Sequence, residues 1–188
     1  MVAGLVLVDS TSEDLKVLDE LDLAILNAES DDKAWLDKCK DYSLLSQEEI
    51  RKVINPIFTE KSKHFPNYIR QRLIDFQLKP SIYKAMYSEI NNWQRDAEII
   101  KKLGRFPNTP LFVIGRDKEF NIQLGIEDGL PEREIRLLEE KWQELIIDQL
   151  NLSNHSELLF VQEASHSIHL DRPDIIIESI LKFVEKVI

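Results

Sequence analysis

Three side chains that can exchange protons each come at or shortly after the end of an apolar run: Asp9, Asp117 and His166. Short apolar runs bounded by turn residues are typical of strands buried in a parallel sheet. The carboxyl ends of such strands meet at one edge of the sheet, so these three groups can lie together. A carboxylate beside an imidazole fixes its tautomer and stabilises the imidazolium, as a general base requires. The pattern therefore indicates His166 as a base, with Asp117 or Asp9 as its acid.

A nucleophile for such a base is not recognisable in the chain. The nucleophile elbow of serine hydrolases reads G-x-S-x-G, because its strained backbone needs small neighbours. The chain has five glycines, and the pair with that spacing, Gly125 and Gly129, has Glu127 at its centre. Ser10 directly follows an apolar run but lacks flanking glycines. We therefore expect Ser10 to be a turn or helix-capping residue.

A metal site is the other chemistry that the histidine segment suggests. His166 and His169 are three residues apart, and Asp171 is nearby. The segment lacks the dense set of ligands found in structural zinc sites. We therefore expect no metal ion and no other cofactor, with one of the two histidines a packed loop residue.

Strands and helices must alternate to position these residues. Strands are predicted at 2–8, 111–114 and 158–161. A helical region spans about 15–103, and Ser46 followed by Glu49 predicts a capping box within it. An amphipathic helix is predicted at 132–150, and a final helix begins near Pro173. The order predicts an α/β fold with a small parallel sheet joined by right-handed crossovers.

The segment between the second strand and the helix at 132–150 contains Gly125, Gly129 and Pro131. These residues favour turns and interrupt helices. We therefore interpret the segment as a linker.

Composition excludes several classes of partner. The chain of 188 residues has 24 Lys and Arg against 34 Asp and Glu, a net charge of −10, which argues against nucleic acid and anionic membranes. No stretch approaches the roughly 18 apolar residues of a membrane span, and no signal peptide is recognised. The single cysteine, Cys39, excludes an internal disulfide, and its charged neighbours suggest an ordinary thiol on a helix surface. A cytoplasmic location is expected.

Three segments, VAGLVLVDS, PLFVIGRD and SHSIHLDRPDIII, occur in the order found in a known family. They resemble the carboxyl-terminal part of α/β-hydrolase fold enzymes, closest to esterase-like members with a helical cap. The resemblance implies that the three strands match the sixth to eighth of that fold. It implies core segments at 1–26 and 105–188, with a helical cap at 27–104. It assigns the general base to His166 and the acid to Asp117, with Asp9 as the alternative, and Ser165 stands where members often have glycine.

The resemblance also implies a reaction, the hydrolysis of an ester or related small acyl substrate by Ser-His-Asp catalysis. The family's nucleophile elbow and oxyanion-hole segment precede the part matched here, so we expect them outside this chain. On that expectation the chain is the second half of a hydrolase and is inactive alone. The alternative is a non-catalytic fragment or interaction protein that associates through its exposed first strand, since unpaired strand edges invite pairing.

Overall fold

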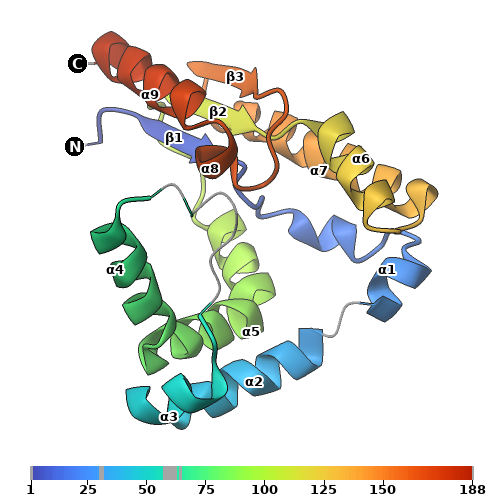
Figure 1. Ribbon diagram of the computed structural model, residues 1–188. Coiled ribbons are helices and arrows are strands. Elements are labelled where there is room, and N and C mark those ends of the chain that lie inside the picture. Colours follow the sequence, from blue (N-terminus) through green and yellow to red (C-terminus); the bar gives the residue numbers. More distant parts are fainter. Residues whose placement is uncertain (1, 30–31, 57–62, 64, 188) are drawn as a thin grey trace. The chain divides into compact units, whose positions relative to one another are not determined.

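A computed structural model (Figure 1) describes residues 2–29, 32–56, 63 and 65–187. The chain divides into two compact units, one formed by residues 1–29 and 94–188 and the other by residues 30–93. Helix α5 (Pro80–Lys102) contributes residues to both units. Each unit has a core of its own, so the two are described in turn.

The first unit contains a parallel sheet of three strands in the order β1-β2-β3. The strands are β1 (Leu5–Val8), β2 (Leu111–Gly115) and β3 (Ser156–Phe160). Their register aligns Leu5 with Leu111 and Leu111 with Ser156. Every residue of β2 is buried, whereas β1 is only half-buried because it forms an edge of the sheet. The α/β class with a small parallel sheet is thus confirmed, although β1 begins later and β3 earlier than predicted.

Helices cover both faces of this sheet (Figure 1). These are α7 (Glu132–Asp148), continued by the 3-10 helix η3 (Gln149–Leu152), and α9 (Pro173–Val187), preceded by the short α8 (Ile168–Asp171). On one face Phe112 stacks with Phe183 of α9, their ring centroids 5.8 Å apart. On the other face Val113 packs in a cluster with Ile146 of α7. Alternate residues of β2 therefore serve two cores, as expected of a central strand.

The segment interpreted as a linker is largely helical, so that interpretation is wrong. Helix α6 (Lys118–Glu127) occupies most of it. A Cβ at Gly125 would lie 2.8 Å from Cγ1 of Ile135, so this glycine allows α6 to approach α7 closely. Gly129, with φ of 87°, follows the end of the helix. Gly125 is thus required by the close packing of α6 on α7 and does not mark a turn.

The first unit also contains the 3-10 helix η1 (Leu15–Leu18) and helix α1 (Ala24–Glu29). The second unit is helical where it is described. It comprises α2 (Asp32–Leu44), α3 (Gln47–Val53), α4 (Asn67–Gln77) and the first part of α5. The predicted capping box is confirmed, because Ser46 accepts from the Glu49 amide while the Glu49 carboxylate accepts from the Ser46 amide.

Cys39 lies inside the second unit, and its prediction as a surface thiol is wrong. Its exposed fraction is 0%, and it packs in a cluster with Ile50, Leu78 and Tyr83. The charged neighbours of Cys39 in sequence point elsewhere, because adjacent helical residues differ by about 100° in direction. Burial raises the pKa of the Cys39 thiol.

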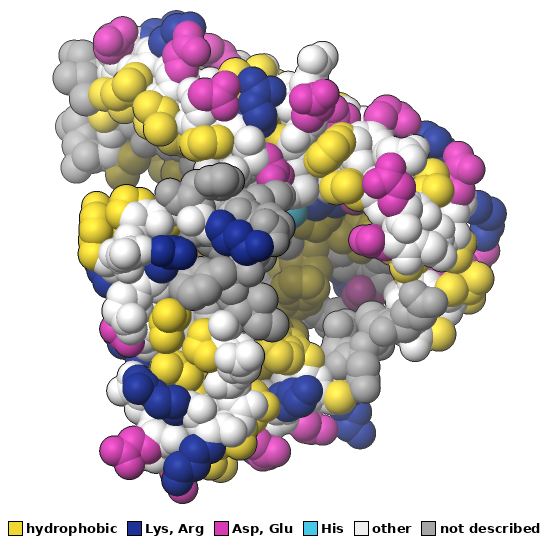
Figure 2. Space-filling view, in the orientation of Figure 1, with side chains coloured by type: hydrophobic (Ala, Val, Ile, Leu, Met, Phe, Trp, Pro, Cys, Tyr) yellow, Lys and Arg dark blue, Asp and Glu magenta, His cyan; other side chains and the backbone are white. Residues whose placement is uncertain are grey.

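Charges of both signs are interspersed on the face of the molecule drawn in Figure 2. On that face, Lys and Arg side chains are scattered among acidic and apolar ones instead of gathered in one patch. Several Lys and Arg side chains of the described residues are paired with carboxylates, as Arg136 is with Glu119 and Glu132. Of the helices in the described ranges, none combines the length and apolarity that crossing a bilayer demands.

Candidate functional site

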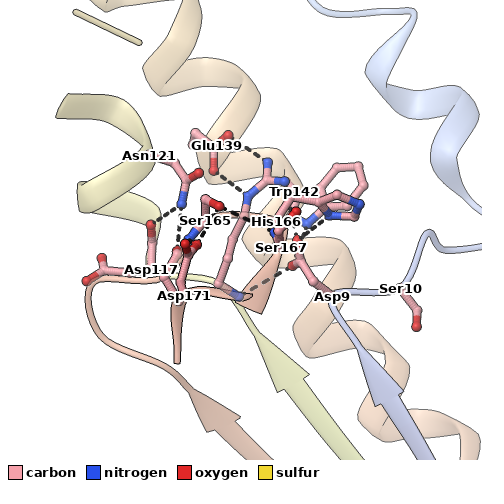
Figure 3. A network of polar contacts seen from close by, with 12 residues as sticks. Asp9, Ser10, Asp117, Asn121, Glu139, Trp142, Ser165, His166, Ser167 and Asp171 are labelled. Atoms are coloured by element: carbon pink, nitrogen blue, oxygen red, sulfur yellow. Dashed lines mark hydrogen bonds and ion pairs between the residues drawn. The ribbon is translucent and has the colours of Figure 1, made fainter. Parts of the chain in front are cut away.

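Asp9 and His166 meet at the carboxyl edge of the sheet (Figure 3). Asp9 directly follows β1, and His166 lies in the loop between β3 and α8. Nδ1 of His166 is 2.8 Å from Oδ2 of Asp9. The Asp9 side chain is fully buried, whereas the His166 side chain is 65% exposed. The imidazole is therefore anchored at one nitrogen, and Nε2 lies on the opposite side of the ring.

The backbone at Asp9 explains how its carboxylate comes to lie at this edge. Its amide still donates to the carbonyl of Ile114 in β2, at 2.7 Å. Its φ of 44° then places it in the left-handed region, which turns the chain out of the strand. Asp and Asn are enriched there among residues with a side chain, yet the conformation still costs about 1–3 kcal/mol. Such strain persists only where the surrounding contacts fix it, as they do here.

The remaining donors to Asp9 come from two other elements. The indole Nε1 of Trp142, on α7, donates to Oδ1 at 3.0 Å. Arg116, just after β2, donates its amide to Oδ1 at 3.4 Å and Nη1 to Oδ2 at 3.3 Å. Both oxygens of the buried carboxylate are thus satisfied, as a buried charge requires.

Arg116 links Asp9 to a second buried carboxylate, that of Glu139 on α7. Arg116 donates Nε to Oε2 of Glu139 at 2.9 Å and Nη2 to Oε1 at 2.6 Å. The guanidinium lies 4.5 Å from the centroid of the Trp142 ring, within cation–π range. Burial raises the pKa of Glu139, and the positive charge of Arg116 opposes that effect.

Asp117, which the sequence favoured as the acid, is hydrogen-bonded to backbone amides. Its carboxylate caps α6 by accepting from the amide of Phe120 at 3.1 Å, and it accepts from the amide of Glu163 at 3.0 Å. Within the described part of the chain, no hydrogen bond or ion pair joins Asp117 to His166. Of the two carboxylates that the sequence offered, the structure brings Asp9 into contact with the histidine. Asp117 begins a helix, so its oxygens are used by nearby amides.

The end of β2 nevertheless holds the histidine loop in place. The amide of Asp117 donates to the carbonyl of Ala164 at 3.1 Å, and Nδ2 of Asn121 donates to the same carbonyl at 3.0 Å. Ala164 is fully buried and lies two residues before His166. These bonds fix the loop just before the imidazole.

The other polar groups of the histidine segment point to other partners. Asp171 accepts from the amide and the hydroxyl of Ser165, at 2.7 and 2.6 Å, and so closes the loop on itself. His169 is exposed on α8. Over the described ranges, no three His, Cys, Asp or Glu side chains are grouped as a metal would need.

Ser10 follows Asp9, but its hydroxyl is directed away from His166 (Figure 3). Its carbonyl accepts a hydrogen bond from Gln149 at 2.8 Å. Among the residues that the structure describes, no hydroxyl or thiol is hydrogen-bonded to the His166 ring. In the part of the chain that the structure describes, the histidine and the carboxylate are thus paired without a nucleophile hydrogen-bonded to the ring.

Sequence reasoning missed three members of this cluster. The amphipathic helix predicted at 132–150 contains Trp142 and Glu139, but no role in the site was predicted for either of them or for Arg116. One signal was present, because Glu139 and Trp142 are three residues apart on one helix and share a face. What each residue contacts still depends on strands far away in sequence.

No family model matches this chain, and neither a curated protein nor a solved structure shows significant similarity to it. Functional inference therefore rests on the residues and their geometry.

Proposed function

We propose that this chain carries the general base and the orienting acid of an α/β-hydrolase type enzyme acting on an ester or related small acyl substrate. His166 is the base, and Asp9 is the acid. The observation that carries the proposal is the 2.8 Å contact from a fully buried carboxylate to an imidazole that is 65% exposed. One side of the ring is fixed, and the other remains open to a reactant.

The chemistry follows from this arrangement. An ionised carboxylate only accepts hydrogen bonds, so Asp9 selects the tautomer with hydrogen on Nδ1 and leaves the lone pair on Nε2. Nε2 takes the proton of a serine hydroxyl as that oxygen bonds to the acyl carbon of the ester. The imidazolium, stabilised by Asp9, returns the proton to the departing alcohol. Water then cleaves the acyl-enzyme by the same route, and the acid is released.

In this proposal the nucleophile and the oxyanion-binding donors are supplied from outside residues 1–188, because no hydroxyl or thiol of the described residues is hydrogen-bonded to the His166 ring. The test uses the full protein product of the gene that encodes these residues, together with any protein that copurifies. A fluorophosphonate probe should label a serine in that material, and p-nitrophenyl ester hydrolysis should fall at least about 10³-fold in His166→Ala, given the size of triad effects. Residues 1–188 alone should remain unlabelled.

A matched control is the other histidine of the same segment. His169→Ala should keep its activity, because His169 is exposed and three residues away. Asp9→Asn should lose most activity, whereas Asp117→Asn should lose less. Full hydrolysis by His166→Ala, or no labelled serine in any of the material, contradicts the proposed function. Labelling at Ser10 would contradict the proposal that the nucleophile is supplied from outside residues 1–188.

The second candidate function is association of two copies through β1. Within the described residues β1 pairs only with β2, and its other edge is open. The amides of Leu5 and Asp9 face β2, so by alternation the amide of Val6 faces the open edge. Light scattering should then show a dimer at micromolar concentration, a monomer for Val6→Pro, and a dimer for Val2→Pro. A monomeric wild type contradicts this candidate.

A further inference from the structure

Glu139 lies on α7 and has no direct hydrogen bond to His166 or Asp9 among the described contacts. We propose that Glu139 is a positioning residue, which keeps the Asp9 carboxylate available to His166 by holding the guanidinium of Arg116. The proposal deepens the proposed function and rests on it for its catalytic meaning, although the coupling itself can be measured without a substrate.

The contacts of Arg116 are unequal on its two sides. Toward Glu139 it makes two charge-assisted hydrogen bonds, at 2.9 and 2.6 Å. Toward Asp9 its guanidinium makes one longer contact, at 3.3 Å. A fork-to-fork arrangement is the strongest geometry for an arginine and a carboxylate. The positive charge is therefore balanced mainly by Glu139.

His166 and Arg116 share one oxygen of Asp9. Nδ1 of His166 lies 2.8 Å from Oδ2, and Nη1 of Arg116 lies 3.3 Å from that oxygen. If Arg116 were released from Glu139, it would be free to move onto Oδ2. It would then neutralise the charge that stabilises the imidazolium. Glu139 thus acts on His166 through Arg116.

A count of the charges supports this coupling. With neutral His166, the cluster of Asp9, Glu139 and Arg116 has two negative charges and one positive charge, and protonation of the histidine balances it. Without the Glu139 charge, the same protonation leaves the cluster with an excess positive charge in a partly buried site, which is unfavourable.

Other charged groups near His166 come from its own segment and from the end of β2. They are Glu163, His169, Asp171, Arg172 and Asp117. Asp117 and Asp171 are held by local amides and by Ser165, Arg172 is paired with Asp174, and Glu163 and His169 are exposed. None of the five has a described contact with Arg116, so an effect of changing Glu139 does not pass through them.

The test is an NMR titration of the His166 imidazole in residues 1–188, with its signals assigned by their loss in His166→Ala. Glu139→Gln should move the titration midpoint of His166 to lower pH, because the imidazolium loses support. Glu140→Gln is the matched control, since it removes an equal charge from the next, exposed position of α7. Its midpoint should stay close to that of the wild type.

A double-mutant cycle separates action through Arg116 from a direct effect of charge. In an Arg116→Gln background, Glu139→Gln should shift the midpoint less than in the wild type. If Glu139→Gln does not fold, Glu139→Met repeats the test with an uncharged side chain of similar volume. An unchanged or raised midpoint overturns the proposal, as does an equal shift in Glu140→Gln or in the Arg116→Gln background. The titration uses no substrate, so its result does not depend on whether the protein hydrolyses esters.

Discussion

Asp9 accepts hydrogen bonds from three different side chains and one backbone amide, although its side chain is fully buried. The donors come from α7, from the end of β2 and from the loop after β3. A carboxylate in this setting is stable only while its donors remain. One of these contacts joins Asp9 to His166, so the group that satisfies part of the buried charge is also the imidazole of the proposed site.

Replacing Asp9 with Asn tests this dependence. The amide keeps the size of the side chain and is tolerated at φ of 44°, so the backbone is not disturbed. The NH2 group of asparagine would lie against groups that donate hydrogen bonds to Asp9, and Arg116 would lose one of its two negatively charged partners. We expect the free energy of unfolding to fall by about 3–5 kcal/mol in urea titration, the range for breaking a buried pair.

Asp117→Asn is the control for this change. Asparagine is also a good helix-capping residue, so capping of α6 should largely persist. A loss within about 1 kcal/mol is expected, on the scale of a helix cap. Equal losses of unfolding free energy in Asp9→Asn and Asp117→Asn would contradict the larger contribution that we expect from Asp9.

Helix α1 depends on a carboxylate that is more than a hundred residues away in sequence. Glu134, on α7, accepts from the amides of Ile25 and Leu26, each at 3.0 Å. These amides lie in the first turn of α1, where no partner exists within the helix. Glu134 is buried, so it both caps α1 and ties it to α7.

Removal of this cap by Glu134→Ala should release the first turn of α1. Hydrogen exchange at Ile25 and Leu26 should accelerate roughly tenfold, which corresponds to about 1.4 kcal/mol, within the range for a lost cap. Glu140→Ala, an exposed position on the same helix, should leave both amides as protected as in the wild type. Unchanged exchange in Glu134→Ala would show that the carboxylate does not hold α1.

The whole chain contains two units with separate cores, and Cys39 lies in the core of the second. Cys39→Ser places a hydroxyl among apolar side chains, which should cost about 1–3 kcal/mol, more than Cys39→Ala. Hydrogen exchange followed by mass spectrometry should show faster exchange in α2 and α3. Protection of α7 and α9 should stay unchanged, and an equal loss there would show that the two cores unfold together.

Glu139 gives the stability of the whole protein a specific dependence on pH. Burial raises its pKa in the folded chain, while in the unfolded chain the carboxyl titrates at its ordinary value. Between these two pKa values the folded state binds more protons than the unfolded state does. The stabilisation that Glu139 gives by binding a proton is therefore complete at acid pH and is lost as pH rises through the folded pKa. Relative to the wild type, the unfolding free energy of Glu139→Gln should therefore increase from acid to neutral pH.

Urea titrations at a series of pH values check this sign. Glu140→Gln, at the exposed position next to Glu139 on α7, is the matched control. A difference between Glu139→Gln and wild type that stays flat, or that falls as pH rises, would contradict the effect of burial.

The amino-acid sequence by itself determined the local parts of this protein. Apolar runs predicted the three strands, the spacing of Ser46 and Glu49 predicted a capping box, and Pro173 marked the start of a helix. These features depend on residues a few positions apart, so a pattern along the chain is sufficient. The sequence also named His166 with Asp117 as the favoured acid and Asp9 as the alternative, because all three follow strands whose ends share one edge.

Only the tertiary structure decided which groups meet. The bond between Asp9 and His166 joins residues 157 positions apart, and that between Trp142 and Asp9 spans 133. The choice of Asp9 over Asp117 depends on a left-handed residue after β1 and on the start of α6 after β2. Likewise, the burial of Cys39 depends on which face of α2 meets its neighbours. These contacts and burials depend on distances and desolvation in the folded chain, which cannot be predicted from the spacing of residues along the sequence.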